Sequence, residues 1–178
     1  MKRIDTECGS DGLEKLEAGE TLLLSGAVMA CRDRAHRRMA ELLSRGMTLP
    51  FEPRGAALFY AAPTPAPPGR VCGALGPTTS QRMDAFTLPL VEAGVRMFIG
   101  KGPRSPLVTS SMAAAGAVYL AAAGGTAALG GGCVDSCVVA AWEDLGSEAL
   151  YRIVLRDYPV FVALDLHGGN LFEMRMRK

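Results

Sequence analysis

Residues 73–84 of this chain, GALGPTTSQRMD, combine side chains that suit the binding of a small anion. A glycine-containing turn leads to two hydroxyl residues, Thr78 and Thr79, and Arg82 follows. The pattern predicts a turn that passes into a helix, where free backbone N–H groups also favour an anion. If Thr78 opens this helix, Arg82 lies one turn further on, and both side chains can face one ligand. Simple capping of the helix by a threonine is the alternative.

A second candidate segment, residues 32–38, places four arginines within seven residues. Arg32 and Asp33 are expected at the start of a helix that follows a strand. An arginine at that end opposes the helix dipole, which favours an anionic ligand or a partner such as Asp33. A solvated helix face is the alternative explanation for the whole run.

A third segment places Lys101 between Gly100 and Gly102, where the backbone can approach a ligand closely. Three segments that each follow an expected strand therefore carry a cation. If they converge, arginine forks and a lysine point charge would bind a small dicarboxylate. The spacing alone leaves scattered surface charge as the other interpretation.

The elements that must position these residues form an alternating pattern. Apolar runs predict strands, and apolar residues at helical spacing predict helices between them. The prolines of residues 63–69 predict an extended loop, and residues 167–170 predict a turn. This order indicates a mixed α/β domain with more than one sheet layer and flanking helices. The expected strands are 21–25, 56–60, 96–99, 118–120, 137–142, 151–155 and 160–164, and the expected helices are 32–45, 83–94 and a segment after Pro106.

Composition indicates one globular domain. Of the 178 residues, 49% are apolar and 21% are charged, and the net charge of +1 gives no electrostatic reason to expect nucleic acid or an anionic membrane as a partner. We expect an N-terminal arm at residues 1–18, loose or docked on a partner, and a single domain at residues 19–178. No apolar run suggests a signal peptide or a membrane span, and five scattered cysteines suggest a reducing compartment, so the expected location is cytoplasmic.

Other site types are not supported by the spacing of residues. Residues 94–102 depart from the phosphate-loop pattern, and the glycines at 130–132 lack the spacing of a dinucleotide fingerprint. Cys133 and Cys137 lie four residues apart, but no further thiolate or imidazole lies near them in the sequence. We therefore predict no metal site in this chain.

Six blocks of sequence, in order, resemble the β subunit, or C-terminal domain, of class I iron–sulfur fumarate hydratases and their tartrate dehydratase relatives. The resemblance extends from about residue 19 to residue 172. The blocks are residues 24–26, 31–38, 63–66, 76–84, 100–105 and 143–146.

The resemblance implies a swivelling β/β/α domain that forms half of a hydro-lyase, which interconverts fumarate and water with L-malate. In that family three cysteines of the α subunit hold a [4Fe-4S] cluster, and no cysteine here corresponds to them. The implied partners are therefore a cluster-carrying α subunit and a small dicarboxylate, in a dimer of αβ units. This chain alone is expected to be inactive.

Residue by residue, Arg32, Arg82 and Lys101 resemble the family residues that hold the substrate carboxylates, and Thr78 resembles the residue proposed as the catalytic base. Cations would stabilise the aci-carboxylate formed when a carbon next to a carboxylate loses a proton. A neutral threonine hydroxyl is a poor base, so its alkoxide would have to be favoured by the same cations. The general acid would come from the partner.

Five further residues are expected to support this site. Asp33 and His36 would orient Arg32 or face the interface, although a simple helix pair explains them equally well. Arg104 and Ser105 would border the same pocket, and Thr79 adjoins the expected base.

The substrate is less defined than the family. The proline loop and residues 101–105 favour fumarate, whereas Cys31 before Arg32 and the pair of arginines at 37–38 are nearer the tartrate enzymes. A non-catalytic module that binds small anions is the remaining alternative.

Overall fold

The computed structural model of the protein describes residues 1–176, so the last two residues of the expected domain lie outside it. Its strands form a seven-stranded sheet in the order β1-β2-β3-β4-β5-β7-β6. Strands β1 to β5 pair in parallel, whereas β7 runs antiparallel to β2, β5 and β6. The strands are β1 (Lys2–Asp5), β2 (Thr21–Cys31), β3 (Ala57–Tyr60), β4 (Met97–Gly100), β5 (Val118–Ala121), β6 (Val134–Ala141) and β7 (Leu150–Leu164).

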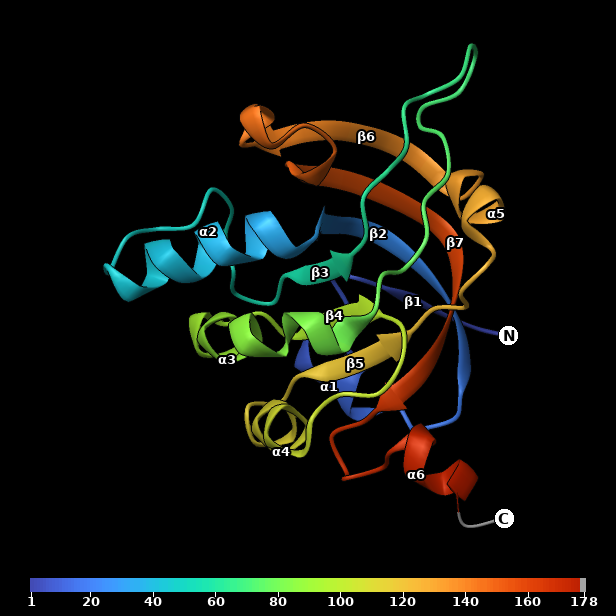
Figure 1. Cartoon of the computed structure of the whole chain (residues 1–178). Coiled ribbons are helices and arrows are strands. Elements are labelled where there is room, and N and C mark those ends of the chain that lie inside the picture. The colour runs from blue at the N-terminus through green and yellow to red at the C-terminus, as the bar shows by residue number, and fades with distance from the viewer. Residues whose placement is uncertain (177–178) are drawn as a thin grey trace.

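The helices α2 (Asp33–Ser44), α3 (Asp84–Ala93) and α4 (Pro106–Ala114) connect successive parallel strands. They lie side by side along one face of the sheet (Figure 1). All three were expected from the sequence. Helix α3 ends at Gly94, which adopts the left-handed conformation that favours glycine. The other helical segments are α1 (Gly9–Glu14), η1 (Ser80–Met83), α5 (Ala127–Gly131), η2 (Glu143–Glu148) and α6 (Leu171–Met176).

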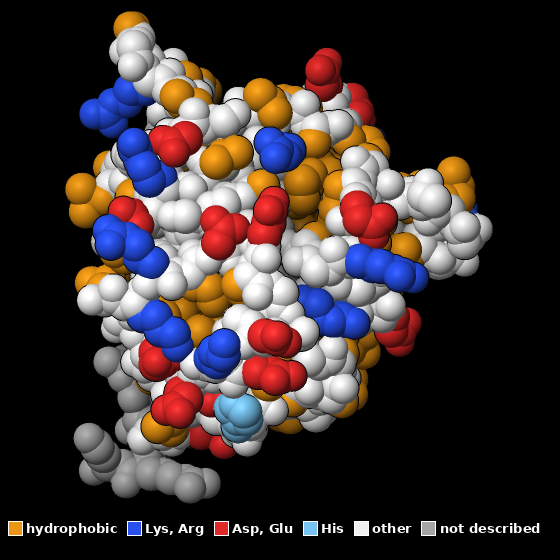
Figure 2. All heavy atoms as spheres, turned by 180° about the vertical axis from the view of Figure 1, so that it is seen from behind, with side chains coloured by type: hydrophobic (Ala, Val, Ile, Leu, Met, Phe, Trp, Pro, Cys, Tyr) orange, Lys and Arg blue, Asp and Glu red, His pale blue; other side chains and the backbone are white. Residues whose placement is uncertain are grey.

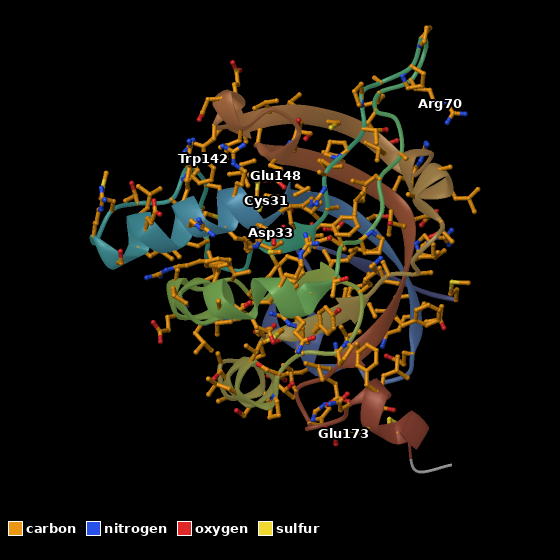
Figure 3. The ribbon with its side chains drawn as sticks, viewed as in Figure 1. Cys31, Asp33, Arg70, Trp142, Glu148 and Glu173 are labelled. Atoms are coloured by element: carbon orange, nitrogen blue, oxygen red, sulfur yellow. The ribbon has the colours of Figure 1, made fainter. Side chains whose placement is uncertain are left out.

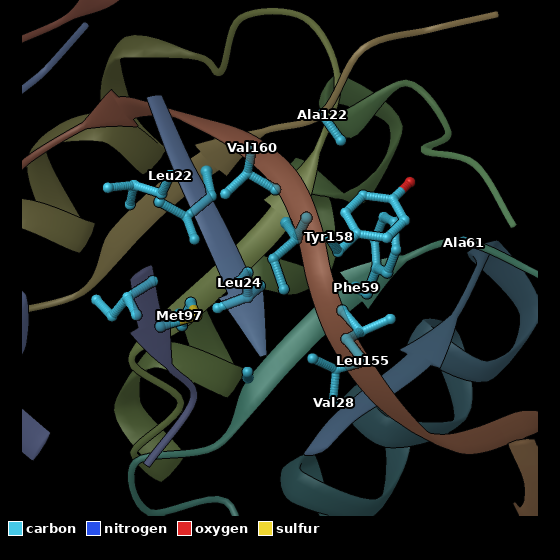
Figure 4. Packing of buried hydrophobic residues seen from close by; sticks show 14 of the residues in the cluster. Leu22, Leu24, Val28, Phe59, Ala61, Met97, Ala122, Leu155, Tyr158 and Val160 are labelled. Atoms are coloured by element: carbon cyan, nitrogen blue, oxygen red, sulfur yellow. The ribbon is translucent and has the colours of Figure 1, made fainter. Parts of the chain in front are cut away.

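The sheet folds back on itself because β2 pairs with both β3 and β7. Hydrogen bonds therefore pass from β2 through β3, β4, β5 and β7 and return to β2. One apolar core fills the space between the two layers that result, and Figure 4 shows Leu24, Phe59 and Tyr158 packed within it. The expected layers are thus confirmed as parts of one curled sheet rather than as separate sheets.

A second core lies between the sheet and the three helices. Side chains of successive strand residues point to opposite faces. Phe59 and Ile99 accordingly enter the core between the sheet layers, whereas Tyr60 and Phe98 enter the core under the helices. This double burial explains why β3 and β4 are apolar at nearly every position.

Two strands continue through points where the sequence indicated an end. We expected a strand to end at Gly26, but β2 continues to Cys31, and Gly26 instead marks a bulge with φ of +106°. We also expected two strands within residues 151–164, but β7 is continuous through Asp157, which has φ of +51°. Both irregularities bend a strand without ending it, because the backbone on each side stays paired.

The first eighteen residues, expected as an arm, pack against their own domain. Strand β1 pairs with the first half of β2, and Leu13 and Leu16 are buried in the core between the sheet layers. The weak periodicity of this segment did not indicate its short edge strand and its short helix, α1.

The proline-rich loop after β3 projects from the body as a narrow ribbon (Figure 1). Backbone hydrogen bonds join Thr64 to both Gly73 and Ala74 across its base. When the molecule is seen from behind, basic and acidic side chains are interspersed without a large patch of one sign (Figure 2). Among residues 1–176, no helix combines the length and apolarity required to cross a bilayer.

Candidate active site

The carboxyl ends of four parallel strands meet along one edge of the sheet. Cys31 of β2 is in register with Tyr60 of β3, and Gly100 of β4 is in register with Ala121 of β5. Arg32 and Lys101 are the next residues of their strands, so their backbones share this edge. They are separated by two strand spacings, or roughly 10 Å. In α/β sheets this edge is the usual place for a ligand.

Thr78 lies between the ends of β3 and β4. Its N–H donates to the Tyr60 carbonyl at 2.7 Å, and its own carbonyl accepts from the Lys101 N–H at 3.2 Å. The Lys101 carbonyl in turn accepts from the Ser80 N–H at 2.9 Å. The expected base and the expected lysine are therefore held together by backbone hydrogen bonds.

The expectation that Thr78 opens a helix is wrong. The helical turn η1 begins at Ser80, and residues 77–79 are instead paired with neighbouring strand ends. Thr79 occupies the position before η1 but makes no side-chain capping hydrogen bond. Simple capping thus does not explain the two threonines, and the one-turn spacing from Thr78 to Arg82 does not apply.

Arg82 contacts the start of α2 through a two-pronged ion pair. Its Nε and Nη2 donate to the two carboxylate oxygens of Asp33 at 3.1 and 2.6 Å. Burial raises the pKa of the Asp33 carboxyl, but the hydrogen bond and charge of Arg82 outweigh burial and hold this pKa below its usual value. Arg82 is thereby directed toward the helix end that carries Arg32.

Arg32 retains an unused donor. Its Nη2 lies 4.0 Å from Glu148 Oε1, and its Nε is buried without a hydrogen-bond partner among the described residues. Figure 3 shows Asp33 and Glu148 near the start of α2, with Cys31 beside them. A buried donor without a partner costs about 1–3 kcal/mol. A ligand carboxylate that accepts from Nε would remove this cost.

His36 lies beneath Arg32 and is fully buried. Its Nδ1 is 2.9 Å from the Arg32 carbonyl, and because a carbonyl only accepts, Nδ1 carries the proton. Burial lowers the pKa of His36 to about 4, so the ring is neutral at pH 7. Burial also raises the pKa of the neighbouring Cys31 thiol. His36 therefore holds the backbone at Arg32. It makes no hydrogen bond to Asp33, whose carboxylate pairs with Arg82.

Arg104 is committed to contacts inside the chain. Its three guanidinium nitrogens donate to Asp84 at 2.6 Å, to the Tyr60 hydroxyl at 3.0 Å and to the Thr87 hydroxyl at 2.6 Å. Ser105 donates its N–H to the other Asp84 oxygen at 2.8 Å and caps α4 with its side chain. These two residues fasten the turn that follows β4.

The candidate residues thus form two linked pairs at one sheet edge. Thr78 is joined to Lys101, and Arg82 is joined to Asp33 beside Arg32. No hydrogen bond or ion pair within residues 1–176 connects one pair directly to the other. The side chain of Lys101 passes Gly124, where an added Cβ would lie 3.8 Å from Nζ, so the loop after β5 also borders this edge.

The cysteines of this chain do not fit an iron–sulfur cluster. Among the described residues, no three His, Cys, Asp or Glu side chains are grouped so that they could hold a metal ion. Burial also raises the pKa of the Cys137 thiol to about 11, which disfavours the thiolate form that binds metals. A hollow of about 550 Å³ lies elsewhere, at the amino end of β3, and none of the expected site residues lines it.

Four residues at this edge were not anticipated. Glu148 lies near Arg32, and the Asp84 carboxylate pairs with Arg104. The hydroxyls of Ser80 and Tyr119 are hydrogen-bonded to each other beside the turn that follows Lys101. The only sequence signal for Tyr119 was its alternate position in a strand, which places it on the helix side of the sheet.

These features define an α/β domain whose sheet edge carries cations suited to carboxylates. The chain belongs to the family described as "Fumarase C-terminus", whose model matches residues 2–175. The resemblance expected from the sequence is confirmed.

Among known proteins, the chain is 34% identical over 163 residues to the aerobic class I fumarate hydratase of Escherichia coli K12, and 36% identical over 163 residues to mitochondrial fumarate hydratase 1 of Leishmania major. These matches cover 90% of this chain but only 30% of each relative, so the chain spans about a third of their length. It is also 32% identical over 177 residues to the L(+)-tartrate dehydratase subunit beta of Escherichia coli K12, with 96% of this chain and 87% of that subunit covered.

Proposed function

We propose that this chain is the β component of an iron–sulfur hydro-lyase, and that its substrate pair is fumarate and L-malate. The observation that carries the proposal is the junction of Thr78 with Lys101 at the sheet edge that also bears Arg32. Membership of the fumarase C-terminal family and the named fumarate hydratase relatives support it.

In this proposal the cations bind and stabilise the substrate carboxylates. Arg32 donates from its Nε, which has no partner among the described residues, to one carboxylate, and the Lys101 ammonium acts as a point charge for the substrate. Loss of the proton from the carbon next to a carboxylate moves negative charge onto that carboxylate. Fixed cations stabilise this charge more strongly in the transition state than in the ground state.

Thr78 is proposed to remove that proton. Two hydrogen bonds fix the backbone of Thr78. The direction of its half-buried side chain is therefore set by the turn. A threonine hydroxyl must first lose its own proton to act as a base, and nearby positive charge favours the alkoxide. The proton donated to the leaving hydroxyl would come from the partner.

The cofactor and the assembly also belong to the proposal. A [4Fe-4S] cluster would be held by an α subunit. The tartrate dehydratase relative is named a β subunit, which supports the existence of an α partner. When bound, the cluster would supply a Lewis acid for the substrate hydroxyl. We further propose a dimer of αβ units and a cytoplasmic location.

L-tartrate is the second candidate substrate. The specific observation in its favour is the match to the tartrate dehydratase β subunit, which covers 87% of that protein, whereas the match to each fumarate hydratase covers about 30%. A module that binds small anions without catalysis is the third candidate.

The test is anaerobic reconstitution of this chain with its cluster-carrying partner, followed by assays on fumarate, L-malate and L-tartrate. The proposal predicts turnover of fumarate and L-malate that neither component shows alone. Turnover of L-tartrate alone would contradict the assignment of fumarate and L-malate and identify L-tartrate as the substrate. Absence of turnover on all three, with an intact cluster, would contradict the hydro-lyase proposal and favour the non-catalytic module.

A further inference from the structure

Two hydroxyl groups behind the candidate site fasten the turn that carries Lys101. The Tyr119 hydroxyl donates to the Gly102 carbonyl at 2.8 Å. Because that proton is used on Gly102, Ser80 Oγ is the donor in its own 2.8 Å bond to Tyr119. The Ser80 N–H also donates to the Lys101 carbonyl. The four residues therefore form a closed ring of hydrogen bonds around the Lys101–Gly102 peptide.

This ring lies in the interior, where hydrogen bonds hold a geometry firmly. Ser80 and Tyr119 are both fully buried. Burial raises the pKa of Tyr119, so its hydroxyl keeps the proton that the ring requires. The Arg104 guanidinium lies 5.4 Å from the centre of the Tyr119 ring and adds a cation–π contact.

Gly100 provides the space that Ser80 occupies. A Cβ at this position would collide with the Ser80 hydroxyl and would lie 2.7 Å from the Tyr60 ring. The backbone of β4 can therefore approach Ser80 closely only because residue 100 is glycine. Gly102 follows with φ of +79°, which turns the chain immediately after Lys101.

We infer that Ser80 and Tyr119 are positioning residues that fix the backbone of Lys101, from which its ammonium extends, relative to Thr78. The inference rests on the proposed function, since it gives a catalytic purpose to that geometry. Lys101 is bonded to Thr78 on one side through its N–H, and the hydroxyl ring holds its carbonyl and the following turn on the other. Misplacement of a catalytic group by about 1 Å can lower a rate about a hundredfold.

The first test observes Lys101 itself and needs no activity. The chain contains four lysines, so reductive ¹³C-methylation gives a small set of NMR signals, and Lys101→Arg identifies the signal of interest. Tyr119→Phe removes only the hydroxyl and should shift the Lys101 signal. Tyr158→Phe is the matched control, because it removes another buried hydroxyl, which donates to Leu75 at 3.3 Å. It should leave the Lys101 signal in place.

The second test uses the protein reconstituted with its partner. Tyr119→Phe and Ser80→Ala should each lower kcat about tenfold or more, with a smaller change in KM, because the loss falls on transition-state geometry. Tyr158→Phe should have nearly wild-type kinetics. If Tyr119→Phe fails to fold, Ser80→Ala opens the same ring from its other end.

The two tests separate this inference from the proposed function. If Tyr119→Phe shifts the Lys101 signal but the wild-type assembly has no hydro-lyase activity, the proposed function is contradicted while the positioning role is supported. If Tyr119→Phe and Ser80→Ala leave the Lys101 signal unchanged, or if Tyr158→Phe shifts it equally, the positioning role is overturned.

Discussion

The guanidinium of Arg82 donates two parallel hydrogen bonds to the carboxylate of Asp33, at 3.1 and 2.6 Å. This pair joins the turn η1 to the first residue of α2, although the two residues lie 49 positions apart in the sequence. Both side chains are more than a third exposed. The pair therefore serves orientation more than stability, because exposed ion pairs contribute only about 0–1 kcal/mol.

Replacement of Asp33 by Asn should lower kcat/KM of the reconstituted enzyme by about tenfold or more, because Arg82 loses its two-pronged partner and its fixed direction. The free energy of unfolding should change by less than about 1 kcal/mol. Steady-state kinetics and denaturant unfolding measure the two quantities. Asp135→Asn is the matched control, since it removes a carboxylate from the exposed pair with Arg156 at 3.3 Å. Equal kinetic losses in the two variants would refute an orienting role for Asp33.

Replacement of Arg104 by Ala should destabilise the fold by about 3–5 kcal/mol, because the mostly buried Asp84 carboxylate loses its partner and two buried hydroxyls lose a donor. Thermal or urea unfolding measures this loss. Arg156→Ala, at an exposed position, should have little effect. A loss below about 1 kcal/mol for Arg104→Ala would show that the turn after β4 is held by other contacts.

The stability of the chain should fall as the pH is lowered from about 6.5 toward 4. The unfolded chain protonates His36 near its ordinary pKa of about 6.5, whereas burial lowers the folded-state pKa to about 4. The unfolded state therefore binds more protons in this window, and up to about 3 kcal/mol of stability is lost across it. Urea unfolding at a series of pH values gives the slope.

The variant His36→Leu should remove most of that slope, because the titrating group is gone. His167→Leu is the control, since that side chain lies at the surface and its Nε2 donates to the Glu14 carbonyl at 2.9 Å. An unchanged slope in His36→Leu would mean that other groups cause the pH dependence.

Much of the fold was predictable because local patterns agreed with the tertiary structure. The apolar runs at β3, β4 and β5 are short and bounded by turn residues, and the helices between them end near glycine. The strand breaks expected near Gly26 and Asp157 were not real, because a bulge and a bend give the same local signal as a strand end.

The site was only partly predictable. The order of strands and helices indicated that Arg32 and Lys101 follow strands, and parallel pairing then brings their backbones to one edge. The bond between Thr78 and Lys101 joins loop backbones 23 residues apart, so no periodicity indicates it. The approach of Glu148 to Arg32 likewise depends on how η2 packs against α2.

The most direct measurement of the central claim is a crystal structure of this chain with its cluster-carrying partner and bound L-malate or a non-reactive dicarboxylate analogue. The account predicts one carboxylate within hydrogen-bond distance of Arg32 Nε and a substrate carbon facing the Thr78 hydroxyl, with the Lys101 ammonium close to the same ligand. A dicarboxylate bound away from the carboxyl ends of β2, β3 and β4, or Arg32 and Lys101 directed away from it, would contradict the account.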